Sequence, residues 1–289
     1  MAVFQALIEI TNKVDNYKDS KNLLLKNLKP FLIEFKKKEL CLSKSKAKTD
    51  EFDEIILLRD FATDLWNEVI VHKINESKPT YQSQVLQKML NRFLIQIKET
   101  LFLLSHDLGL SAISNVRLFM ESFAITNYIL DKGEIEAERF LDYGYYQEAL
   151  DSKLELDPKF TAKYGERTKD NKFYFIPYGW CSEEKMTGEK LIKRINSDKV
   201  LDFYRLTCNY IHASPYSLMQ VSKSSDPFFP IPKKTLINIV RVILFNFIML
   251  VLNYTMNDSE KHPYLVLLTM FVPDLFNYTE EAEEIINNI

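Results

Sequence analysis

The sequence predicts an all-α fold, a helical bundle with one irregular, aromatic-rich insertion. Glycine is rare, with 6 residues in 289, while leucine, isoleucine, lysine and glutamate are frequent, and this composition favours helices over sheets. Apolar residues recur at helical spacing along several long segments. They make up 46% of the chain against 27% charged residues, which suits a soluble globular protein with a large core.

The N-terminal part of the chain has the spacing of helices. Residues 1–40 predict one or two helices with a break or kink at Pro30, because proline interrupts helical hydrogen bonding. Residues 51–74 place their apolar side chains on one face and predict a further helix. We expect residues 1–75 to form a segment that packs on the bundle or extends from it, and residues 76–289 to form the main helical domain.

The middle of the chain holds the strongest helical patterns. Residues 82–105 predict a long helix, and residues 111–131 are apolar nearly all round, which predicts a helix at the centre of the bundle. We expect Gly109 to end the first of these helices and Ser111 to cap the second. Residues 136–156 predict a surface helix with an aromatic face.

Residues 157–182 are the least helical part of the sequence. They combine many aromatic residues with two prolines and two glycines, which predicts an irregular insertion. A short hairpin around residues 172–180 is one form that this insertion can take. The helical pattern returns over residues 187–214.

Residues 236–254 require comparison with a membrane span. Arg241 interrupts this apolar stretch, and a central arginine costs roughly 2.5–3.5 kcal/mol on insertion into a bilayer. A buried core helix is therefore favoured over a membrane helix, and we expect no membrane partner. A membrane-acting effector that inserts residues 236–254 is the least favoured alternative. The N-terminus lacks the basic region of a signal peptide, and the three cysteines are far apart, so we expect a cytoplasmic protein.

Several classes of function lack their motifs. The net charge of −3 gives no overall basic field for nucleic acid. The sequence contains no glycine-rich nucleotide loop, no G-x-S-x-G nucleophile motif and no histidine or acidic cluster at metal-ligand spacing. We expect neither a cofactor nor a metal ion.

The first polar group in an apolar helix is Arg117 with Glu121. The two residues are four positions apart and share a helix face. A charged pair in a core is costly unless its hydrogen bonds are satisfied. Proteins accept that cost at functional sites and also for structural specificity, so both interpretations stay open.

The second polar group is Arg205 with His212. Seven helical residues turn the chain through about 700°, so the two side chains fall about 20° apart on one face. Arginine binds phosphate through two hydrogen bonds, and histidine exchanges a proton near neutral pH, so the pair suits phosphate chemistry. The structural alternative is a core histidine bonded to a carbonyl, with Arg205 paired to an acid elsewhere.

The two segments that contain these groups, SNVRLFMESFAITNYIL and FYRLTCNYIHAS, resemble an uncharacterised family of all-helical bacterial proteins. The pattern of that family is R-x3-E, followed by a tyrosine-containing helix that ends in H-x-S. The matching positions are Arg117, Glu121, Tyr204, His212 and Ser214. The family is similar to the HEPN superfamily (higher eukaryote and prokaryote nucleotide-binding domains), helical bundles whose R-x4-6-H signature Arg205 and His212 match. The resemblance covers about residues 85–255.

The resemblance implies a metal-independent endoribonuclease that leaves 2′,3′-cyclic phosphate and 5′-hydroxyl ends. His212 would be the general acid or base and Arg205 would stabilise charge in the transition state. The implied supporting residues are Arg117, Glu121, Tyr204, Asn209 and Ser214. HEPN proteins occur in toxin–antitoxin, abortive-infection and CRISPR systems. The implied protein is therefore a toxin or anti-phage effector that binds RNA, forms a homodimer with a composite site, and has an antitoxin or defence protein as a further partner.

One position departs from the HEPN pattern. Many active HEPN nucleases have a polar residue, often asparagine, directly after the arginine, whereas this chain has Leu206. Some HEPN domains have lost catalysis. The alternative is a non-catalytic helical interaction module that partners a nuclease or ATPase in a defence complex. It predicts Arg205 in a core ion pair, with Glu121 as the candidate partner, and a buried His212.

Overall fold

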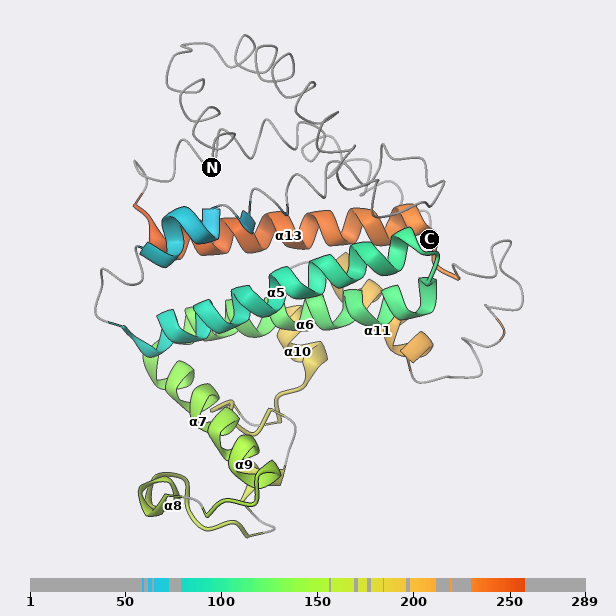
Figure 1. Cartoon of the computed structure of the whole chain (residues 1–289). Helices are drawn as coiled ribbons and strands as arrows, with labels where there is room; N and C mark the ends of the chain where they lie inside the picture. The colour runs from blue at the N-terminus through green and yellow to red at the C-terminus, as the bar shows by residue number, and fades with distance from the viewer. Residues whose placement is uncertain are drawn as a thin grey trace.

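The computed structural model shows an all-α protein (Figure 1). It describes residues 59, 62–63, 65–72, 79–155, 157–168, 171–175, 178–183, 185–195, 198–211, 219 and 230–257. The one or two helices expected over residues 1–40 lie outside this part of the chain. Within it the helical segments are η1 (Trp66–Ile70, a π-helical turn), α5 (Tyr81–Ser105), α6 (Gly109–Lys132), α7 (Glu134–Asp151), α8 (Pro158–Tyr164), α9 (Lys172–Phe175), α10 (Gly188–Lys193), α11 (Asp198–Ile211) and α13 (Lys233–Thr255).

Helix α5 confirms the strong periodic pattern predicted over residues 82–105. Its start is a capping box: the Thr80 hydroxyl accepts from the Ser83 amide at 3.1 Å, and the Thr80 amide donates to the Ser83 hydroxyl at 3.0 Å. The carboxylate of Glu134 also accepts from the amides of Tyr81 and Gln82, at 2.7 and 3.2 Å. A negative charge is favourable at a helix N-terminus, so this contact joins the start of α7 to the start of α5.

The turn between α5 and α6 differs from the sequence expectation. Gly109 begins α6 instead of ending α5, and Ser111 lies inside α6 instead of capping it. The reversal is made by Asp107, whose φ of 58° is left-handed, and the Leu108 amide donates to the Leu103 carbonyl at 2.9 Å. This is the arrangement of a Schellman motif, and an aspartate takes the place that glycine usually has.

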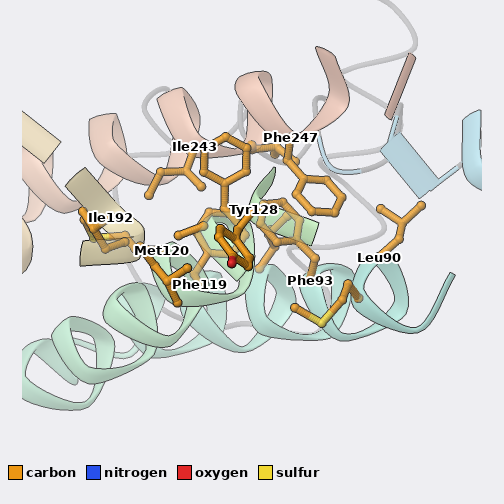
Figure 2. Close-up of a cluster of buried hydrophobic side chains, with 14 of the residues drawn as sticks. Leu90, Phe93, Phe119, Met120, Tyr128, Ile192, Ile243 and Phe247 are labelled. Atoms are coloured by element: carbon orange, nitrogen blue, oxygen red, sulfur yellow. The ribbon is translucent and has the colours of Figure 1, made fainter. Parts of the chain in front are cut away.

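Helix α6 lies at the centre of the bundle, as its apolar composition predicts. It packs against α5, α7, α10, α11 and α13. Figure 2 shows the core that α5, α6, α10 and α13 share. The Phe93 ring stacks on Phe119 at 4.0 Å between centroids and on Phe247 at 3.7 Å, so three helices meet at one aromatic column.

Helix α13 confirms the helix predicted over residues 236–254. It lies along α5 and α6 (Figure 1). Among the described helices, α13 is long and apolar enough to cross a membrane, but 56% of its most apolar window is buried inside the structure. Arg241 is also buried, on the side of α13 that includes Val240 and Leu244.

Helix α7 leads away from the bundle, and α8 and α9 lie near its far end (Figure 1). Residues 172–175 form helix α9, so the hairpin considered for this part of the insertion is wrong. The reason is a dense aromatic cluster, in which Phe173 stacks on Tyr164 at 4.1 Å and also contacts Phe160. The short helices α8 and α9 bring these rings together, and the described residues of this part contain no strand.

The segment after the insertion forms two helices where the sequence predicted helix over 187–214. Helix α10 ends at Lys193, and α11 begins at Asp198. Thr187 caps α10 by accepting from the Lys190 amide at 3.2 Å. Both helices pack on α6, and this arrangement places Tyr204 of α11 against the charged pair of α6.

Candidate functional site

Arg117, Glu121 and Tyr204 form one cluster between α6 and α11, which we call the Arg–Glu–Tyr cluster. The Arg117 Nε donates to Oε1 of Glu121 at 3.1 Å. The Tyr204 hydroxyl donates to the same oxygen at 2.7 Å and accepts from Nη2 of Arg117 at 3.2 Å. The guanidinium carbon of Arg117 lies 4.9 Å from the centre of the Tyr204 ring. Three of the residues marked by the sequence pattern are therefore in direct contact.

The Arg–Glu–Tyr cluster is largely shielded from water. The side chains of Arg117 and Glu121 are 18% and 20% exposed. Burial raises the pKa of Tyr204, and its hydrogen bond to Glu121 adds to this shift. Burial acts to lower the pKa of Arg117, but the hydrogen bond to Tyr204 and the charge of Glu121 are among the effects that raise it, and the net shift is upward. Tyr204 is therefore a neutral donor and Arg117 a permanent cation at neutral pH.

Two residues that the sequence patterns did not identify complete the surroundings of this cluster. A Cβ added to Gly188, the first residue of α10, would overlap the Tyr204 hydroxyl and lie 2.9 Å from the Tyr178 hydroxyl. Tyr178 has a left-handed φ of 63°, which is rare for an aromatic residue and marks local strain. Burial raises its pKa to about 12, with Glu121 adding to the shift and Arg117 opposing it.

Cys208 is a third neighbour and lies one turn after Tyr204 on α11. Burial raises the pKa of its thiol, Arg117 opposes the shift, and Glu121 and Glu189 add to it. The thiol is therefore protonated at neutral pH and is not an activated nucleophile. No local sequence signal identifies Tyr178, Gly188 or Cys208 as neighbours of the cluster, because each depends on how α10 and α11 pack on α6.

Arg205 follows Tyr204 in the chain but lies on the surface, with 53% of its side chain exposed. Its Nη2 and Nε donate to Oε1 of Glu189 at 2.5 and 3.0 Å, and its Nη1 donates to Asp202 at 3.4 Å. The core ion pair with Glu121 that the interaction-module alternative predicts is therefore wrong, because Glu121 binds Arg117 and Tyr204 instead.

The remaining predicted site residues are on α11 or beyond it. Asn209 is exposed on α11. His212 and Ser214 lie outside the described residues, because the described part of α11 ends at Ile211. The structure thus brings Arg117, Glu121 and Tyr204 together. It places Arg205 and Asn209 on the exposed side of α11. Among the described residues, no group of three or more histidine, cysteine, aspartate or glutamate side chains could hold a metal ion.

The fold and the cluster define an all-helical protein with a shielded Arg–Glu–Tyr contact between two helices of its bundle. Residues 84–229 match the family of unknown function DUF5677. The match covers half of the chain, and the chain belongs to this family. It includes both polar segments, with Arg117 and Glu121 in one and Tyr204 and Arg205 in the other. Comparison with curated proteins gives no match, and comparison with solved structures gives none either.

Proposed function

We propose that this protein is a metal-independent endoribonuclease of HEPN type that acts as a homodimer, as a toxin or anti-phage effector in the cytoplasm. The observation that carries the proposal is the position of Arg205, a half-exposed cation on α11, seven residues before His212. An arginine that is accessible on a helix can bind a phosphate through two hydrogen bonds. The two carboxylates that now hold Arg205 are themselves exposed, at 50% for Glu189 and 69% for Asp202.

Exposed ion pairs of this kind are weak. They contribute about 0–1 kcal/mol, because water and salt screen them. A phosphate that carries a full negative charge and offers several oxygens can replace such a carboxylate partner at low cost. The geometry therefore supports an Arg205 that exchanges Glu189 for an RNA phosphate.

The Arg–Glu–Tyr cluster has a positioning role in this proposal. Tyr204 is buried and joined to α6 through Glu121 and Arg117. Because Arg205 is the next residue, this anchor fixes where the arginine leaves the helix. The cluster would hold the helix that presents Arg205, and it would not touch the RNA itself.

The proposed reaction is an internal transfer at phosphorus. The RNA 2′-oxygen bonds to the adjacent phosphorus atom while the bond from phosphorus to the 5′-oxygen breaks. His212 of one copy takes the 2′-hydroxyl proton, and an acid in the dimer site, for which His212 of the second copy is the candidate, gives a proton to the 5′-oxygen. Arg205 stabilises the charge that develops on the phosphate oxygens. The products are a 2′,3′-cyclic phosphate and a 5′-hydroxyl.

The test is cleavage of RNA by the purified full chain in the presence of EDTA. We expect Arg205→Ala and His212→Ala to lose cleavage by at least about 100-fold, the scale of one general acid–base or charge-stabilising group. Arg92→Ala, which removes an exposed arginine from α5, is the matched control and should cleave like wild type. Mass spectrometry of the ends should find cyclic phosphates, and induction of the wild-type gene in a bacterial host should arrest growth.

A second candidate function is the non-catalytic interaction module, and one observation favours it. Arg205 contacts two carboxylates, which together compensate its charge. Glu189→Gln separates the two candidates because it removes one of these charges. The nuclease proposal expects Glu189→Gln to tighten RNA binding several-fold in an anisotropy titration and Arg205→Ala to weaken it. Absence of RNA cleavage by the folded wild type, with RNA affinity unaffected by both changes, would favour the interaction module.

A further inference from the structure

A cavity of about 410 Å³ lies beside α7, α8 and α9 and is lined by none of the three residues of the Arg–Glu–Tyr cluster; we call it the α7–α9 cavity. Its walls come from α7, the end of α8, the start of α9 and residues within 178–183 and 185–186. The volume is in the range of pockets that hold small organic ligands. Among its lining residues are four cations, Arg139, Lys163, Lys172 and Lys185.

Three of these cations have charged atoms that no acid among the described residues neutralises. The Arg139 Nε donates to the Trp180 carbonyl at 2.8 Å, and neither of its Nη atoms has a hydrogen-bond partner among the described residues. Lys172 and Lys185 likewise form no ion pair within the described part of the chain. The Trp180 carbonyl thus fixes the guanidinium while its outer nitrogens stay available for a ligand.

The acid among the described lining residues is already paired. Glu183, the one carboxylate among the lining residues, forms ion pairs with Lys132, at 3.0 Å, and with Arg194. Salt bridges hold the pKa of Glu183 below its usual value, the one with Lys132 contributing most, so it stays ionised and engaged. Among the described lining residues the surplus of charge is therefore positive, and a concave site with one sign of charge concentrates ligands of the opposite sign.

The cavity also has an aromatic wall. The Tyr164 and Phe173 rings stack with an interplanar angle of 13°, and the Arg139 guanidinium lies 5.6 Å from the centre of each. The Tyr164 hydroxyl donates to Asp142 at 2.6 Å, which orients its ring. A rigid arginine over aromatic rings beside two lysines fits a ligand with a phosphate and an attached ring better than a simple inorganic cation or an apolar molecule.

We propose that the α7–α9 cavity binds a small phosphate-bearing ligand through Arg139, Lys172 and Lys185. This inference does not rest on the proposed ribonuclease function, because none of these residues belongs to the Arg–Glu–Tyr cluster or to the Arg205–His212 pair. Tyr178 lines the cavity, and its hydroxyl also lies close to Gly188, beside the Tyr204 hydroxyl of the cluster. The two sites are therefore neighbours that share one tyrosine.

The test is calorimetric titration of the full chain with four probes: inorganic phosphate, ribose 5-phosphate, adenosine 5′-monophosphate and adenosine. We expect the three phosphate-bearing probes to bind and adenosine to bind much more weakly. Tighter binding of the monophosphate than of ribose 5-phosphate would assign part of the affinity to the base, and equal binding would assign it to the phosphate group. Both results support the proposal.

The variants for this test are chosen to keep the fold. Lys172→Ala with Lys185→Ala changes two exposed side chains and should weaken phosphate binding about tenfold or more, which corresponds to about 1.4 kcal/mol. Lys98→Ala, which removes an exposed lysine from α5, is the control and should bind like wild type. The proposal is overturned if no phosphate-bearing probe binds wild type at millimolar concentration. Equal binding by the double variant, or equal binding of adenosine, would overturn it as well.

Discussion

The Tyr204 hydroxyl and the Glu121 carboxylate, 83 residues apart in the chain, form a 2.7 Å hydrogen bond that joins α11 to α6. Both side chains are largely shielded, so the bond forms where water competes weakly for the donor and the acceptor. The same hydroxyl accepts from Arg117. One phenol oxygen thus connects Arg117 and Glu121 of α6 to the helix that carries Arg205.

Replacement of Tyr204 by phenylalanine tests the strength of this connection. Tyr204→Phe keeps the ring but leaves Glu121 without one donor, and hydrogen bonds to charged groups contribute about 1.5–3 kcal/mol. We expect the free energy of unfolding to fall by about 1–2 kcal/mol in urea titrations. The control is Tyr145→Phe, at an exposed tyrosine of α7, and a loss of equal size there would contradict the assignment.

Two glycines should respond to alanine in opposite directions. A Cβ at Gly188 would overlap the Tyr204 hydroxyl, so Gly188→Ala must displace the tyrosine and should destabilise the fold by about 1–3 kcal/mol. Gly144 lies within α7, and nothing is within 4 Å of a Cβ added there. Gly144→Ala should therefore stabilise the protein by about 0.5–1 kcal/mol through helix propensity. Thermal unfolding of both variants gives the two signs directly.

Stability should fall steeply in alkaline solution, in part because of Tyr178. Burial raises its pKa from 10.0 to about 12 in the folded state. Between these values the unfolded chain releases the proton while the folded chain keeps it, so stability decreases as pH rises through this window and is fully present below pH 10. Tyr178→Phe removes this contribution. Urea midpoints measured across the window should fall less steeply in the variant, and parallel curves would contradict the expectation.

Glu136 should be important for stability, although it plays no part in the proposed reaction. It is 3% exposed and accepts from the Tyr128 hydroxyl at 3.1 Å and from the Ser182 amide at 2.6 Å. Glu136→Ala leaves both donors without this acceptor, and we expect a loss of about 2–4 kcal/mol in unfolding free energy. Glu148→Ala, at an exposed glutamate of the same helix, should change stability by less than about 0.5 kcal/mol.

The parts of the fold that follow from local patterns could be predicted from the sequence. The apolar residues of α5, α6 and α13 specified these helices and their burial, because the spacing and density of apolar residues are local properties of the sequence. The α5–α6 turn could not be predicted, because an aspartate adopts the left-handed conformation for which Gly109 was the expected residue. The hairpin option failed because packing among aromatic rings, which is not local, decided the structure of residues 172–175.

The candidate site shows the same division. The four-residue spacing of Arg117 and Glu121 predicted their contact, since it requires only one helix. The partnership of Glu121 with Tyr204, and of Arg205 with Glu189, depends on how α10 and α11 dock on α6. The pairing of His212 with Arg205 stays a prediction, and the cleavage experiments above address it.

The contact between Glu134 of α7 and the first amides of α5 has a consequence for the order in which the helices fold. The Gln82 side chain donates to the carbonyls of Ile129 and Leu130, next to the Glu134 contact, so the hairpin of α5 and α6 is fastened at its open end as well as at its turn. Contacts that are close in the chain form early because they need little loop closure. During synthesis the hairpin can close while α13 is still unmade. At that stage Phe93 lacks its contact with Phe247. A newly made chain therefore exposes the side of Phe93 that Phe247 later covers, until the C-terminal third of the chain leaves the ribosome.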